Sequence, residues 1–166
     1  MGVAFHNYHS AYKQLPSAEG WRFAIAPYIE TTDSKPLPPA ERPEDFPACF
    51  QAVRGEAGET NIFAIVDAES AFPPMPSKPT RFRDMLDGLS LTILLIELPN
   101  RTAELRANEN MTRDQAYAAL RELEPGEVAY ALMGDGATIP LVGQIDPGLF
   151  DALVTRDGGD IIQEHL

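Results

Sequence analysis

The sequence is poor in the residues that build disulfides, metal centres and nucleic-acid surfaces. Its 166 residues include one cysteine and three histidines, and 13 Lys and Arg stand against 25 Asp and Glu. The single cysteine, Cys49, excludes a disulfide within the chain. The net charge of −12 argues against a nucleic-acid partner or an anionic membrane surface, because both require a basic patch.

Long apolar runs are also missing. The longest run, LTILLIEL at residues 91–98, is far shorter than the roughly 18 residues of a membrane-spanning helix. No signal-peptide pattern of a basic start, an apolar stretch and a small-residue cleavage site is visible. The rest of the composition, with 44% hydrophobic and 23% charged residues, is ordinary for a globular protein. We therefore expect one folded domain over residues 1–166.

The first helix begins without a start signal. A stripe of apolar side chains at helical spacing predicts a helix that ends before Pro16, because proline disfavours helical geometry in the residue before it. The stripe consists of Phe5, Tyr8, Tyr12 and Leu15. No Ser, Thr, Asp or Asn precedes the stripe as an N-cap. We interpret residues 1–15 as the C-terminal part of a longer, truncated helix and expect that Met1 is not the natural start.

The next hundred residues alternate loops with short elements. Residues 21–30 predict a short helix or turn that is broken near Pro27. Residues 35–79 carry nine of the fifteen prolines, which indicates loops with extended pieces. Apolar, β-branched segments predict strands at residues 60–67 and 91–98.

The last third of the chain shows clear local signals. Thr112 and Gln115 match a capping box at the start of a helix. Residues 127–142 have the pattern of a β-hairpin, and Asp146 followed by Pro147 predicts the start of a last helix. Helices at both ends around antiparallel strands predict the α+β class.

Five segments, in order along nearly the whole chain, are similar to the motifs of one protein family. HNYHSAYKQLP is similar to the motif HNYHDxYGxxP, GWRFAIAPYIE to SWRxxLLPYLEQ, and TNIFAIVDAESAFP to TNYxAVxGxxTAFP. RFRDMLDGLSLTILLIEL resembles xDITDGTSNTILVxE, and the segment from YALMGDG to TRDGGDII resembles VLFADGSVRFL…IDPxxLRALLTRxGGE. Together these segments resemble a large bacterial family that is abundant in planctomycetes, a domain of unknown function with a prepilin-type N-terminus.

The chain also departs from the family pattern. The frequent CPSD motif is missing, with only PACF at residues 47–50 in that neighbourhood. Leu89 and Leu91 replace polar residues of DGTSNT, and Pro125 occupies the region where a histidine often precedes the second DG turn. If those polar groups bind a ligand in relatives, this chain has lost some of them.

The resemblance implies a pilin-like fold, in which an N-terminal helix packs on an antiparallel sheet with additional short helices and Pro-rich loops. It also implies export to the cell envelope and anchoring in the inner membrane by an apolar segment upstream of residue 1. The partners expected from it are copies of the same chain or other pilin-like subunits, with no nucleic acid and no cofactor. The chain would be a structural protein, as pilins and pseudopilins are, and not an enzyme.

The HNYH segment, comprising His6, Asn7, Tyr8 and His9, is one candidate interaction or structural motif. Histidines at i and i+3 can share a metal ion on a helix, but a metal site needs one or two more ligands, and no HExxH or CxxC spacing supplies them. The alternative is a pair of imidazoles at the rim of a buried face, hydrogen-bonded to the backbone or to the sheet. We favour this structural role and assign no metal ligand.

The two Asp-Gly pairs, Asp87-Gly88 and Asp135-Gly136, are the second candidate motif. Aspartate before glycine stabilises a turn through its own side chain, which is the interpretation that we favour. A carboxylate site or a calcium site at these acidic turns is the alternative.

No catalytic or cofactor-binding residue is assigned from the sequence. A nucleophile motif such as GxSxG is absent from the sequence, and GEAGET lacks the lysine and the spacing of a phosphate-binding loop. A second hypothesis is an exported module that binds a small molecule or a glycan in a groove beside the Pro-rich loops. An acid-base hydrolase is the weakest hypothesis.

Overall fold

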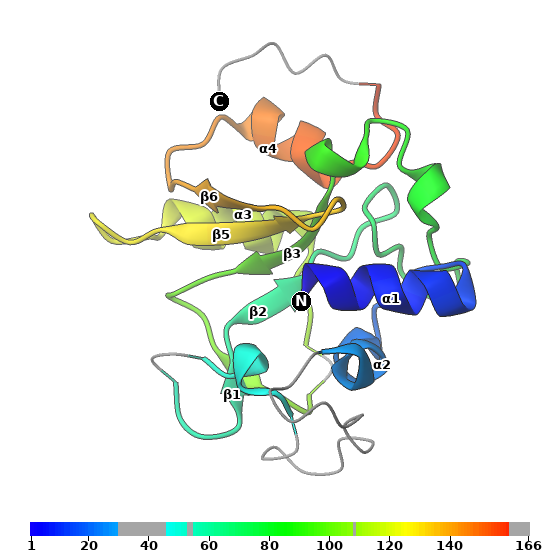
Figure 1. Cartoon of the computed structure of the whole chain (residues 1–166). Coiled ribbons are helices and arrows are strands. Elements are labelled where there is room, and N and C mark those ends of the chain that lie inside the picture. The colour runs from blue at the N-terminus through cyan, green and yellow to red at the C-terminus, as the bar shows by residue number, and fades with distance from the viewer. Residues whose placement is uncertain (30–45, 53–54, 108, 160–166) are drawn as a thin grey trace.

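A four-stranded antiparallel sheet forms the centre of the protein (Figure 1). The computed structural model describes residues 1–29, 46–52, 55–107 and 109–159. The strand order is β2-β3-β5-β6, with bounds Ile62–Ala64, Ile93–Glu97, Ala129–Met133 and Thr138–Leu141. A separate two-stranded sheet pairs β1, Glu59–Thr60, with β4, Ala103–Glu104.

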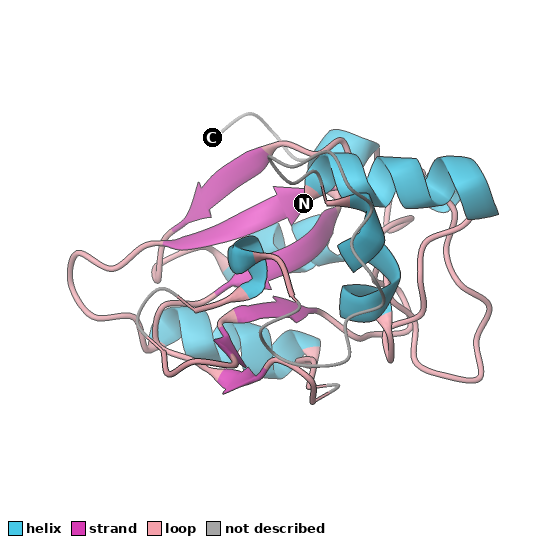
Figure 2. Ribbon diagram, turned by 60° about the horizontal axis from the view of Figure 1, so that its bottom comes forward, coloured by secondary structure: helices cyan, strands magenta, loops and turns pink. Residues whose placement is uncertain are grey.

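Helices cover both faces of the central sheet. On one face lie α1, Gly2–Tyr12, and α2, Trp21–Ile25, which continues into the 3₁₀ turn η1, Ala26–Tyr28. On the other face lie α3, Arg113–Arg121, and α4, Pro147–Val154. Among the described residues, further 3₁₀ turns are η3, Ala48–Phe50, η4, Phe82–Asp84, and η5, Leu89–Leu91. Figure 2 shows the long loops, in pink, that join these elements.

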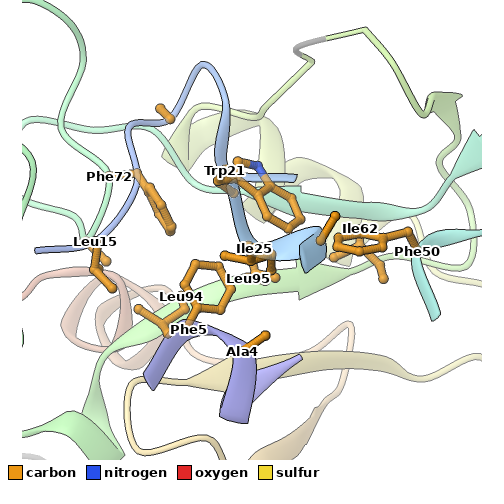
Figure 3. Close-up of a cluster of buried hydrophobic side chains, with 14 of the residues drawn as sticks. Ala4, Phe5, Leu15, Trp21, Ile25, Phe50, Ile62, Phe72, Leu94 and Leu95 are labelled. Carbon is orange, nitrogen blue, oxygen red and sulfur yellow. The ribbon is translucent and has the colours of Figure 1, made fainter. Parts of the chain in front are cut away.

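Each face of the sheet buries its own apolar cluster. Phe5 of α1 and Trp21 of α2 pack on β3 in the first cluster, which Figure 3 shows. Ala119 of α3 and Phe150 of α4 pack on the opposite face. Burial on both faces explains why β2 and β3 read as continuous apolar runs, whereas β5 alternates buried residues with exposed or half-buried ones.

A β-bulge in β3 directs two consecutive leucines to the same face. The register with β5 shifts between Ile93 and Leu95, so that Leu94 is an extra residue in the ladder. Leu94 and Leu95 therefore both enter the cluster under α1, whereas Ile93 and Ile96 enter the other cluster. The bulge gives α1 a larger apolar surface to pack on than strict alternation of side chains would provide.

The first helix lies where it was predicted, but it ends earlier than the predicted end before Pro16. It ends at Tyr12 because Lys13 adopts the left-handed conformation, with φ 61°, and its N–H bonds to His9 O. Leu15 is buried in an extended segment beyond the helix and donates its N–H to Thr80 O. Tyr12 is 57% exposed, so this member of the apolar stripe does not pack the helix on the sheet. The missing side-chain cap at Met1 is confirmed.

The other predicted elements are largely confirmed. The capping box of α3, the β5–β6 hairpin and the Asp146 cap of α4 are all present. The strand predicted at 60–67 is interrupted, because Thr60 pairs with β4 whereas Ile62 pairs with β3. Asn61 lies at this change of partner and donates a hydrogen bond to Glu97 Oε1.

The fold class is α+β, as expected. No helix within the described parts of the chain is long and apolar enough to cross a bilayer.

Candidate functional site

The two histidines of the HNYH segment attach α1 to its own domain. His6 Nε2 donates to Gly134 O at 3.0 Å, and His9 Nε2 accepts from Phe82 N–H at 3.3 Å. The ring of Phe82 lies beside both imidazoles, with centroid distances of 4.6 Å to His6 and 4.3 Å to His9. The two rings thus make the structural hydrogen bonds expected for imidazoles at the rim of a buried face.

The other two residues of the segment have different surroundings. Asn7 is exposed. Tyr8 is half-buried and packs on the rings of Tyr12, at 4.5 Å, and Tyr28, at 5.9 Å. Within the part of the chain that the structure describes, no three His, Cys, Asp or Glu side chains lie close enough to hold a metal ion.

The start of α1 rests directly on the turn between β5 and β6. A Cβ atom on Gly2 would lie 2.7 Å from the Cα of Gly136, so a larger residue would force the helix away from the turn. Gly136 has φ +90°, and Asp135 Oδ1 accepts from Ala137 N–H at 2.8 Å, which is the expected role of an aspartate in its own turn. His6 and Asp135-Gly136 are therefore brought together.

Asp87 has a different role from the one predicted. Its carboxylate does not close its own turn but accepts from Gly158 N–H at 2.7 Å and from Gly159 N–H at 2.8 Å. It ties the Asp87-Gly88 turn to the segment that follows α4, about seventy residues later. Gly88 has φ +105°, which explains the glycine. Asp87 and Asp135 thus serve separate structural contacts.

Sequence reasoning missed the cationic lining of a groove of about 800 Å³, which lies beside Pro73 and Pro79 at one end of the molecule. Its lining includes four cationic side chains, Lys78, Arg81, Arg83 and Arg156. Arg81 is paired with Asp84 through two bonds of 2.8 Å, and Arg156 donates to Ala68 O and Ser70 O. The sequence signal was the run KPTRFR at 78–83, which places three cations within six residues of an acidic chain.

Sequence reasoning also missed a buried arginine. Arg22 of α2 is 2% exposed and donates to three carbonyl oxygens, and its guanidinium lies 4.7 Å from the ring centre of Trp21. Burial lowers the pKa of Arg22 to about 10, so the side chain is still charged at neutral pH. A lone arginine within the apolar segment WRFAI was the available signal.

Acid is expected to weaken the attachment of α1 through His9. The imidazole must be neutral to accept from Phe82 N–H, and burial lowers its pKa, with further lowering by Lys13 and His6 and an opposing effect of Asp84. Because this pKa lies below the value of 6.5 for a free histidine, the unfolded chain takes up the proton first. The stability that His9 contributes is therefore present above pH 6.5 and lost as the pH falls through the pKa of the folded state.

Thermal unfolding of the natural sequence and of His9→Gln measures this loss. Glutamine retains an acceptor for Phe82 N–H but does not titrate. Between about pH 7 and about pH 5.5 we expect the melting temperature of the natural sequence to fall more than that of His9→Gln. Equal falls would show that His9 does not link α1 docking to pH.

Comparisons of this chain with protein-family models, with curated proteins and with solved structures find no match. The interpretation of its surfaces therefore depends on its own geometry.

Proposed function

We propose that this chain is a pilin- or pseudopilin-like domain that works by assembly with copies of itself or with other pilin-like subunits, and not by catalysis. In this proposal the domain lies on the outer side of the inner membrane, in the periplasm or outside the cell. An apolar segment upstream of residue 1 anchors it, as the sequence resemblance implies.

The packing of α1 on the antiparallel sheet is the observation that carries the proposal. Phe5 is fully buried between α2 and β3, and Gly2 lies against the backbone of Gly136 in the β5–β6 turn. The N-terminal helix is thus an integral layer of the domain, as a pilin-like architecture requires. The imidazoles of His6 and His9 make hydrogen bonds within the domain.

Membrane fractionation of the protein in its native cells tests this proposal. The product of the complete gene should sediment with the inner membrane and be released by detergent, and chemical cross-linking should trap species larger than one chain. A variant gene that lacks the codons upstream of residue 1 should give a product outside the membrane fraction. A complete gene product without an apolar N-terminal helix, found only in the soluble fraction, would contradict the proposal.

A second candidate is the exported ligand-binding module, which the groove of about 800 Å³ beside Pro73 and Pro79 favours. Binding to the native state raises the melting temperature, so a thermal-shift screen of sugars and small anions separates the two candidates. Saturable stabilisation by one compound class, lost in Arg83→Ala, would favour this module.

A further inference from the structure

One end of the molecule combines positive charge with exposed apolar side chains. We call the 800 Å³ groove at this end the basic groove; it is lined by Lys78, Arg81, Arg83, Arg156 and Leu86, among others. Leu86 is 77% exposed, which is the largest value among the exposed large hydrophobic residues that the structure describes. Lys78 is exposed and has no ion pair within the described residues, and Arg83 has only a 4.0 Å contact with Asp84. Asp84, which is paired with Arg81, and Asp157 also line the groove, so its four cations outnumber its two carboxylates. Lys78 and Arg83 are the cations that remain for a partner.

The other end combines negative charge with exposed apolar side chains of the sheet. We call this surface the acidic sheet end; it consists of Glu97, Glu124, Glu127, Val128, Tyr130 and Val142. Glu97, Glu127, Val128 and Tyr130 line a cavity of about 360 Å³. Val128, Tyr130 and Val142 are 37%, 43% and 58% exposed. Tyr130 pairs with Pro140, so alternation along the hairpin places Val128 and Val142 on the same face as Tyr130.

The two surfaces lie at opposite ends of the central strands. The basic groove is beside η4, which contacts α1 near the β5–β6 turn. The acidic sheet end surrounds the beginning of β5, at the other end of that strand. In Figure 1 the yellow segment before β5 projects to the left, and the green segment around residues 80–90 lies to the right of the sheet. The molecule is thus polarised along its strands.

We propose that the basic groove of one copy binds the acidic sheet end of the next copy. Both surfaces have an apolar centre with charged side chains around it, and their charges are opposite, which is the arrangement of specific interfaces. The contact is head-to-tail, so a pair of copies retains one free basic groove and one free acidic sheet end, and the association can continue. This inference rests on the proposed function, because it names the surfaces through which the subunits of an assembly would meet.

The free edge of the sheet is unsuited to the same purpose. Met133 N–H bonds to Ala137 O, and hydrogen-bonded pairs alternate along an antiparallel hairpin. The pair Tyr130–Pro140 is therefore a non-bonded pair, in which residue 140 directs its backbone nitrogen away from β5. Proline has no N–H there, so the edge strand β6 lacks a donor that a neighbouring strand would need. The β6 edge is therefore poorly suited to the addition of a strand from a second copy.

Charge reversal in the two surfaces tests the contact. The groove variant carries Lys78→Glu and Arg83→Glu, and the sheet-end variant carries Glu124→Lys and Glu127→Lys. Arg81 and Arg156 are left unchanged because they hold Asp84 and the 68–70 loop. Arg106→Glu is the matched control, because Arg106 is an exposed cation that lines neither surface.

Sedimentation velocity over a range of protein concentrations measures the association of each variant. The natural sequence and Arg106→Glu should associate in low salt and dissociate in high salt, because salt screens exposed charges. Each double variant alone should be monomeric and folded. The groove variant should keep its melting temperature, whereas the sheet-end variant should melt slightly lower because Glu127 Oε2 accepts a hydrogen bond from Glu124 N–H. An equimolar mixture of the two should associate again, because the groove variant retains a natural acidic sheet end and the other retains a natural groove.

Two results would overturn the inference. One is a natural sequence that stays monomeric in low salt, and the other is a mixture that fails to associate while both variants remain folded. Tyr130→Ser removes the apolar centre of the acidic sheet end without a change in charge, so this variant should associate more weakly than the natural sequence. Full association of the Tyr130→Ser variant would likewise contradict the contact. Membrane fractionation and cross-linking of the complete gene product are separate measurements, so assembly through a different surface would leave the proposed function intact.

Discussion

Replacing Arg22 with methionine is expected to lower the free energy of unfolding by about 3 kcal/mol, because three buried or part-buried carbonyl groups lose their donor. Arg22 Nη2 donates to Ile62 O at 2.7 Å and to Glu109 O at 3.0 Å, and Nη1 donates to Ala107 O at 3.3 Å. One side chain of α2 thereby joins strand β2 to the segment before α3. Methionine retains the apolar stem, so most of the loss reports on the hydrogen bonds.

The desolvation of Arg22 opposes this stabilisation. Burial lowers the pKa of Arg22 to about 10, and the Glu109 carboxylate only partly offsets this effect. Because the pKa is lower in the folded state than in the unfolded state, burying the charged form costs free energy at neutral pH. The Nε atom adds to the cost, since it has no hydrogen-bond partner among the described residues. We expect the three carbonyl bonds to outweigh the cost.

Urea denaturation of Arg22→Met and Arg22→Lys decides between these effects. Lysine retains the charge but not the forked geometry that reaches three carbonyl groups, so we expect the Arg22→Lys variant to be destabilised as well. A methionine variant as stable as the natural sequence would show that the desolvation of Arg22 costs as much free energy as its hydrogen bonds contribute.

The elements that the sequence predicted well are those set by neighbouring residues. The capping box joins Thr112 and Gln115, and the cap of α4 joins Asp146 and Leu149, each across three residues. Asp135 likewise bonds two residues ahead. Such contacts form wherever the local backbone permits them, so the residue types alone indicate them.

The features that the sequence did not predict depend on distant partners. Asp87 has the same Asp-Gly context as Asp135, yet its carboxylate binds the backbone of residues 158–159. Tyr12 belongs to the same helical stripe as Phe5, but the buried residues of α1 lie only in its first half. The Tyr12 side chain is exposed and packs on the ring of Tyr8. Equivalent local patterns thus gave different outcomes, since tertiary contacts decide which side chain has a partner.

The bulge in β3 shows the same limit for a strand. The run ILLIEL predicts a strand, but it does not reveal that Leu94 and Leu95 share a face. The bulge becomes necessary only when α1 occupies that face. Likewise, the basic groove combines Lys78 and Arg83 from the middle of the chain with Arg156, more than seventy residues later. The candidate surfaces of this protein are products of its tertiary fold.

Replacing Phe5 with alanine is expected to lower the free energy of unfolding by about 4 kcal/mol. Phe5 is fully buried, and its ring lies 6.1 Å from the rings of both Trp21 and Phe72 (Figure 3). The loss combines the transfer of the ring to water, the cavity that remains, and two aromatic contacts. Val3→Ala is the matched control on the same helix, because Val3 is 64% exposed and should change the stability by less than about 0.5 kcal/mol.

The shape of the unfolding curve tests whether α1 belongs to the cooperative core. Phe5 shares its cluster with Leu94 and Leu95 of the central strand, and Trp21 in the same cluster reports on their packing by fluorescence. We therefore expect Phe5→Ala to unfold in one transition, with the same midpoint by fluorescence and by circular dichroism. An early fluorescence change before the main transition would mean that α1 detaches from a sheet that stays folded. In that case the helix would be a separable arm, and the packing that supports a pilin-like domain would be too weak to carry the proposal.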